Sequence, residues 1–120
     1  MRFRTFKGYI ADFCRLPIHL AGNSFPGIYA FVSVDALGRE RWIYIGQSID
    51  VKDRLLDHEK WKAIMAYQPT HCYVARVESE VDRDDVEQCM IVFYSPLLNV
   101  QHKREQSLYG LFGTRPSKQA

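Results

Sequence analysis

The chain has 120 residues, of which 47% are hydrophobic and 25% are charged, and its formal net charge is +2. This composition describes an ordinary soluble domain, and no apolar run reaches the roughly 18 residues that a membrane span needs. The N-terminal residues lack the apolar core of a signal peptide, so no membrane partner is expected.

The cysteines, Cys14, Cys72 and Cys89, are odd in number and include no Cys-x-x-Cys pair. This spacing argues against a disulfide framework or a cysteine zinc site, and it favours a reducing, cytoplasmic compartment. The three side chains are expected to be buried small hydrophobes.

Charge is unevenly distributed along the chain. Residues 1–26 and residues 101–120 each hold four basic residues and one acidic residue, whereas residues 27–100 hold eight basic and twelve acidic ones. Two basic ends would suit a polyanion. Basic tails are also common in small proteins, and charge alone favours that plainer interpretation.

Residues 1–26 are predicted to form a basic helical arm rather than a separate domain. Phe6, Ile10 and Phe13 recur at helical spacing, which predicts a short helix over residues 5–14. A leucine–proline pair shortly afterwards would end this helix, and a loop would lead into the next element.

The strongest pattern follows directly. Residues 27–33 and 41–46 are rich in β-branched and aromatic side chains, and a polar turn with one glycine separates them. Such runs predict an antiparallel hairpin. Tyr29 and Tyr44 each lie close to a glycine, so two phenols would stand on neighbouring strands with little backbone bulk beside them.

A helix is predicted over residues 51–65, with Ser48 or Asp50 as its cap. Arg54 and His58 are four residues apart and therefore lie on one stripe of this helix. That stripe would run along the rim where the helix meets the sheet.

Residues 71–77 form a third strand by composition, and a capping box opens a helix over residues 81–94. Glu87 shares one stripe of that helix with apolar and aromatic residues, on the face that the sheet should cover. A carboxylate there is costly unless it is paired or holds a metal. Residues 97–100 would be a short extended piece.

These elements predict an α+β domain over residues 27–100, with a small three-stranded antiparallel sheet flanked by helices, and a basic tail over residues 101–120. A phosphate loop, a dinucleotide fingerprint and a Gly-x-Ser-x-Gly elbow are all absent from the sequence. The remaining candidates for chemistry each have an ordinary explanation as packing, surface or turn residues. They are Tyr29, Tyr44, Arg54, His58, Glu87 and Asn99.

Taken in order, these residues resemble the GIY-YIG nucleases. Gly27-Ile28-Tyr29 and Tyr44-Ile45-Gly46 match the elements that name the family, and Arg54-Leu55-Leu56-Asp57-His58 resembles the Arg-x-x-x-His variant of its arginine helix. Glu87 and Pro96-Leu97-Leu98-Asn99 look like its metal-binding glutamate and its closing Pro-x-x-Asn. The 14 residues between the two tyrosines are more than members usually have, and a longer turn is well tolerated.

The resemblance implies a β-β-α-β-α core and a metal-dependent endonuclease that hydrolyses DNA phosphodiester bonds. Arg54 would bind the scissile phosphate, and Glu87 would hold a divalent metal, Mg²⁺ or alternatively Mn²⁺. One tyrosine, left open between the two, would align or deprotonate water, and His58 would take the proton onward. Asn99 would orient Tyr44, Glu87 or a metal-bound water.

Basic residues on the hairpin, on the helix predicted over residues 51–65 and on the tail are expected to contact DNA: Arg39, Arg41, Lys52, Lys103 and Arg104. Two other interpretations stay open. One is a nucleic-acid-binding module on the same fold that does not cut, and the other is a structural protein in which these residues only pack. Target specificity would come from the ends, the long hairpin loop, a homodimer or a protein partner.

Overall fold

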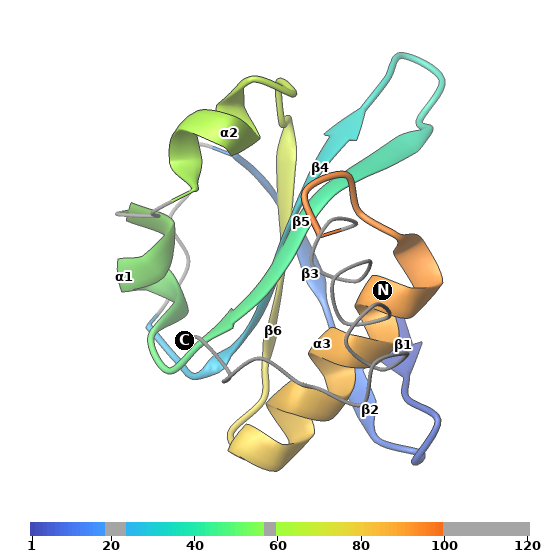
Figure 1. Cartoon of the computed structure of the whole chain (residues 1–120), viewed down its shortest axis with the longest axis vertical. Coiled ribbons are helices and arrows are strands. Elements are labelled where there is room, and N and C mark those ends of the chain that lie inside the picture. Colours follow the sequence, from blue (N-terminus) through green and yellow to red (C-terminus); the bar gives the residue numbers. More distant parts are fainter. Residues whose placement is uncertain (19–23, 57–59, 100–120) are drawn as a thin grey trace, which may run out of the picture.

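A computed structural model describes residues 1–18, 24–56 and 60–99, and this part of the chain has a mixed α+β fold (Figure 1). The elements in chain order are β1 (Arg2–Arg4), β2 (Ile10–Asp12), β3 (Cys14–Pro17), β4 (Gly27–Val34), β5 (Glu40–Ser48), α1 (Val51–Leu56), α2 (Trp61–Met65), β6 (His71–Arg76) and α3 (Glu80–Tyr94). None of the helices in these ranges has the length and apolar content needed to cross a bilayer.

The central sheet has four antiparallel strands in the order β3-β6-β4-β5. The predicted hairpin and third strand are present as β4, β5 and β6. The expectation of a three-stranded sheet is wrong, because β3 pairs with the outer edge of β6, with Cys14 opposite Val74 and Pro17 opposite His71. Proline is tolerated there because an edge strand need not donate every backbone N–H.

The helix expected over residues 5–14 is also wrong. β1 and β2 form a hairpin whose turn is closed by bonds from the Thr5 N–H to the Tyr9 carbonyl and from the Gly8 N–H to the Thr5 carbonyl. Gly8 has φ of 93°, a left-handed conformation that interrupts a helix and suits glycine. Phe6 is 90% exposed at the turn while Phe13 is buried, so the apparent helical spacing does not describe one face.

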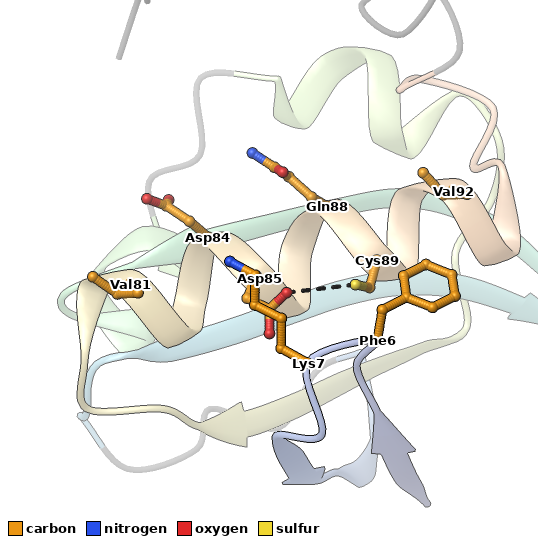
Figure 2. A pocket seen from close by; sticks show the side chains of 8 residues that line it. All are labelled: Phe6, Lys7, Val81, Asp84, Asp85, Gln88, Cys89 and Val92. Carbon is orange, nitrogen blue, oxygen red and sulfur yellow. Dashed lines mark hydrogen bonds between the residues drawn. The ribbon is translucent and has the colours of Figure 1, made fainter.

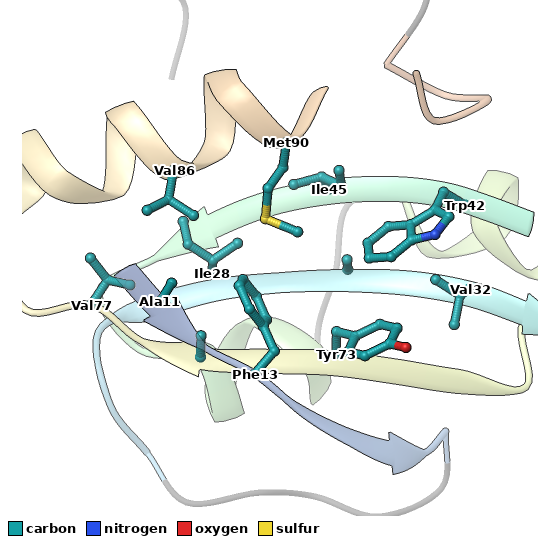
Figure 3. Close-up of a cluster of buried hydrophobic side chains, with 12 residues drawn as sticks. Ala11, Phe13, Ile28, Val32, Trp42, Ile45, Tyr73, Val77, Val86 and Met90 are labelled. Atoms are coloured by element: carbon teal, nitrogen blue, oxygen red, sulfur yellow. The ribbon is translucent and has the colours of Figure 1, made fainter. Parts of the chain in front are cut away.

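Two layers cover the sheet (Figure 1). On the side that we call the α3 face, Val86 and Met90 of α3 and Ala11 of β2 pack against the sheet (Figure 3). On the opposite side, the α1/α2 face, Val51 of α1 and Ile64 of α2 close a second core. Strand β4 is buried on both faces and reads as a continuous apolar run, because its alternate residues serve the two cores.

A β-bulge in β5 decides which face its side chains reach. Phe31 is opposite Tyr44 and Val32 is opposite Trp42, so Ile43 is an extra residue on β5. Trp42 therefore packs on the α3 face, where its ring stacks on the Tyr94 ring with centroids 3.8 Å apart. Ile43 and Tyr44 both turn to the α1/α2 face. Strict alternation would have sent Tyr44 to the side of Trp42.

The helix expected over residues 51–65 is wrong as a single element. The structure describes two helices in this range, α1 and α2. Lys60 is the N-cap of α2, and its backbone angles, φ of −97° and ψ of 12°, are not helical. The last helix is confirmed as α3, which Ser79 caps by accepting a bond from the Asp82 N–H at 3.4 Å. Ser95, in the left-handed region with φ of 47°, ends it.

The extended piece expected over residues 97–100 is a turn in its described part, Leu97 to Asn99. Backbone N–H groups of Leu97 and Leu98 nevertheless donate to the carbonyls of Trp42 and Ile43 at 3.1 and 2.9 Å. The segment thus covers part of β5, which is the edge strand of the sheet.

Burial of Cys72 predicts a pH-dependent stability. Its thiol lies in the core of the α1/α2 face, and burial raises its pKa from 9.0 to about 12. The folded chain therefore holds the thiol proton more tightly than the unfolded chain does. The contribution of Cys72 to the free energy of unfolding is fully present below pH 9 and is lost as the pH rises toward 12. We expect the free energy of unfolding in urea to fall by roughly 1 kcal/mol between pH 7.5 and 9.5.

The control for this prediction compares slopes rather than absolute stabilities. Cys72→Ala should flatten the fall between pH 7.5 and 9.5, whereas Cys14→Ala, at an exposed cysteine, should leave it unchanged. An equal slope in wild-type protein and Cys72→Ala would show that other groups carry the pH dependence.

Candidate functional site

The candidate site lies at the end of β5 that leads into α1, around residues 44–47. β5 is the edge strand of the sheet, so side chains from both faces can meet around it. Tyr29 and Arg54 approach from the α1/α2 face, and Glu87 approaches from α3 on the other face.

Tyr29 lies directly over Gly46, its partner in the β4–β5 ladder. A Cβ atom added to Gly46 would be 2.5 Å from both Cζ and the hydroxyl oxygen of Tyr29. The φ of Gly46 is not positive, so glycine is needed here for space and not for an unusual backbone conformation. A second close approach occurs at Gly27, where an added Cβ would be 2.0 Å from the Ala75 carbonyl oxygen. The two glycines therefore allow a phenol and a neighbouring strand to come close to the backbone.

The Tyr29 phenol is 1% exposed and hydrogen-bonds the Arg54 side chain. Burial raises its pKa well above the usual 10, and the neighbouring Tyr44 and Glu87 act in the same direction. Arg54 opposes this shift through its hydrogen bond and its positive charge without reversing it. Tyr29 is therefore a neutral phenol at pH 7, and it is suited to hold Arg54 in place rather than to accept a proton.

Tyr44 is the more accessible of the two phenols, being half-buried. Its ring centroid is 6.3 Å from that of Tyr29, at an interplanar angle of 40°. Lys60 lies over the Tyr44 ring, with Nζ 5.2 Å from the centroid, within the range of a cation–π contact. The bulge at Ile43 is what brings Tyr44 to this face.

Glu87 has a polar partner, as its place on an inward stripe requires. The amide nitrogen of Gln47 donates to Glu87 Oε1 at 3.3 Å and to Asp84 Oδ1 at 2.7 Å. Arg83 Nε in turn donates to the Gln47 amide oxygen at 3.4 Å. Gln47 therefore connects β5 to two carboxylates of α3 that are one turn apart.

Asn99 is buried and uses both ends of its amide on the backbone of Ile45. It accepts from the Ile45 N–H at 2.9 Å and donates to the Ile45 carbonyl at 3.1 Å. The side chain thus replaces a neighbouring strand at this position of the sheet edge. Any effect of Asn99 on Tyr44 passes through the strand, since Ile45 is the next residue along it.

Five of the six predicted site residues thus surround one short segment of β5, and His58 lies outside the described residues. The basic residues predicted to contact DNA do not gather in the same way. Arg39 pairs with Asp35 in the β4–β5 turn at 2.7 Å, roughly 20 Å along the strand from Gly46. Arg41 donates to the Tyr67 carbonyl at 3.2 Å, and Lys52 is exposed on α1. Lys103 and Arg104 lie outside the described residues.

Four residues near the site were missed from sequence: Lys60, Gln47, Arg83 and Asp84. The sequence positions of two of them, Gln47 and Asp84, could have indicated a role in the site. Gln47 directly follows the Tyr-Ile-Gly element, and Asp84 precedes Glu87 by one helical turn. Lys60 and Arg83 carried no such signal, because the site residues that they contact, Tyr44 and Gln47, are distant in sequence.

The donors present suit a hard divalent cation held by few protein groups. No cluster of three or more histidine, cysteine, aspartate or glutamate side chains with metal-binding geometry occurs in residues 1–18, 24–56 and 60–99. Mg²⁺ needs no such cluster, because it keeps several waters and takes one or two carboxylates together with substrate phosphates. Glu87, with Asp84 beside it on α3, fits that requirement.

A groove of about 450 Å³ lies between the β1–β2 turn and α3 (Figure 2). It is lined by Phe6, Lys7, Val81, Asp84, Asp85, Gln88, Cys89 and Val92. Neither tyrosine of the candidate site, nor Arg54 or Glu87, lines it. Asp84, which accepts the bond from Gln47, is shared by the groove and the candidate site.

Comparison with family models, with curated proteins and with solved structures gave no match to this chain. A functional assignment consequently depends on the residues and on the contacts that the fold creates among them.

Proposed function

We propose that the protein is a metal-dependent endonuclease of the GIY-YIG type that hydrolyses DNA phosphodiester bonds. The observation that supports this most strongly is the convergence of Tyr29, Tyr44, Arg54, Glu87 and Asn99. They come from four separate helices or strands and one turn, and all lie around residues 44–47. Packing alone gives no reason for a guanidinium, two phenols and a carboxylate to meet there.

Arg54 would bind the scissile phosphate. A guanidinium matches phosphate oxygens with its planar donors and stabilises charge that develops on them. Tyr29 holds the Arg54 side chain in place through its hydrogen bond. The second cation, Lys60 beside Tyr44, would attract the DNA backbone to the same place.

Tyr44 is the phenol that we assign to the attacking water. It is half-buried, whereas Tyr29 is 1% exposed and has a raised pKa. A half-buried phenol can be reached by water and can orient it, and Lys60 over the Tyr44 ring adds a positive charge beside it. Tyr29 would then keep its proton throughout and act through Arg54.

Glu87 would hold the divalent cation, which when bound stabilises the negative charge of the transition state and of the leaving oxygen. The hydrogen bond from Gln47 keeps the Glu87 carboxylate oriented at the end of β5. Asn99 holds the strand that carries Tyr44 and Gly46 by its two bonds to Ile45.

The test is cleavage by the full chain with supercoiled, linear, branched and single-stranded DNA and with RNA, in Mg²⁺, in Mn²⁺ and in EDTA. We expect nicking of at least one DNA substrate with either metal and none in EDTA. Salt-sensitive binding to DNA without cleavage under any of these conditions would instead favour a non-cutting module. Absence of both binding and cleavage would leave packing as the role of these residues.

A further inference from the structure

Arg83 is a buried arginine that ties the start of α3 to the preceding turn. Its side chain is 6% exposed, and Nη1 donates to the carbonyls of Val77 and Glu78 at 3.1 and 2.8 Å. Two backbone acceptors therefore fix the position of the guanidinium. A further contact runs from Nε to the Gln47 amide oxygen at 3.4 Å.

This contact sets the direction of the Gln47 amide. Arginine can only donate hydrogen bonds, so the group that faces it must be the amide oxygen. The amide nitrogen then faces the opposite way, where it donates to Asp84 at 2.7 Å and to Glu87 at 3.3 Å. Both acceptors can only accept when ionised, so all three contacts agree with one orientation of the amide.

The Gln47 amide also reduces the repulsion between two carboxylates of α3. Asp84 and Glu87 are three residues apart on one helix face, where two like charges disfavour one another. An amide N–H₂ group between them offers a donor to each carboxylate. The hydrogen bond that Oε1 accepts also limits rotation of the Glu87 carboxylate, whereas a carboxylate without that bond would rotate more freely.

We propose that Gln47, held by Arg83, is a positioning residue that orients Glu87 for a divalent cation. This inference rests on the proposed function, in which Glu87 is the metal ligand. Hydrogen bonds to ligating carboxylates hold the ligand in its binding orientation, and their loss typically weakens metal affinity by about 10–100-fold. A merely structural Gln47 would change stability and leave the metal affinity unaltered.

The test measures Mn²⁺ affinity of the full chain without DNA, by electron paramagnetic resonance of the free ion during titration. Gln47→Leu should weaken Mn²⁺ binding by about 10–100-fold and raise the Mg²⁺ concentration for half-maximal nicking by a similar factor. Gln88→Leu is the matched control, because Gln88 is an exposed glutamine of α3 outside these contacts, and it should bind Mn²⁺ as the wild type does.

A second variant, Gln47→Asn, keeps the test decisive if Gln47→Leu does not fold. Gln47→Asn keeps the amide but shortens the side chain by one C–C bond, about 1.5 Å, so the donor no longer reaches Glu87. It should show the same loss of Mn²⁺ affinity with an unchanged thermal midpoint. Wild-type affinity in a folded Gln47→Leu or Gln47→Asn protein would overturn the inference.

The inference and the proposed function fail in different ways. If Gln47→Asn binds Mn²⁺ normally while Glu87→Gln loses both binding and nicking, then the proposed function stands and Gln47 has no positioning role. If Glu87→Gln binds Mn²⁺ and nicks DNA as the wild type does, then Glu87 is not the metal ligand and both are wrong.

Discussion

Replacing Glu87 with glutamine is expected to reduce Mg²⁺-dependent nicking by about 1,000-fold, because it removes the charge that holds the cation. The substitution keeps the shape of the side chain and an oxygen near Gln47, so the contacts of α3 with β5 should survive. Initial rates on supercoiled DNA at saturating Mg²⁺ provide the measurement. The thermal midpoint of the variant should stay close to that of the wild type.

The control for this experiment is Glu80→Gln. Glu80 is an exposed glutamate in the first turn of the same helix, so its loss removes the same charge without touching the site. It should nick at the wild-type rate. Wild-type cleavage by Glu87→Gln would sink the proposed mechanism, whereas equal losses in both variants would point to the net charge of α3.

Gly46→Ala is expected to destabilise the protein by roughly 2–3 kcal/mol and to displace Tyr29 from the site. The added methyl group would lie 2.5 Å from Cζ and from the hydroxyl of Tyr29, in a buried position where neither can move away freely. Urea denaturation monitors the loss of stability. Because Tyr29 holds Arg54, nicking should fall even where the variant remains folded.

A double-mutant cycle separates this contact from a general intolerance of alanine in the strand. Leucine at position 29 has no atoms where Cζ and the hydroxyl of tyrosine lie, so Gly46→Ala in a Tyr29→Leu background should cost under about 1 kcal/mol. Equal costs of Gly46→Ala in both backgrounds would show that its effect does not come from Tyr29.

Local patterns predicted the elements whose partners are near in sequence. The β4–β5 hairpin follows from two β-rich runs and a turn, and α3 follows from the capping box that begins at Ser79. The predicted helix over residues 5–14 failed because Phe6, Ile10 and Phe13 match a helical period by chance. Strand alternation of Phe3, Ala11 and Phe13, with Gly8 at the turn, was the better signal.

The candidate site was predictable as residue types in order, but its contacts were not. From the sequence, a carboxylate on an inward stripe, that of Glu87, was expected either to be paired or to hold a metal. The structure supplies the Gln47 amide, 40 residues away in sequence. Asn99 was expected to act on Tyr44, Glu87 or a bound water, whereas both ends of its amide bond the Ile45 backbone.

The sequence by itself determined that a hairpin carries Tyr29 and Tyr44 and that a later helix carries Glu87, because strand and helix patterns are local. Only the tertiary structure decided that the phenols share a face and that α3 reaches the same end of β5. The first depends on one extra residue, Ile43, in the β5 ladder, since a shift of one residue moves a side chain to the other face. The second depends on packing between segments some 40 residues apart, which no local pattern records.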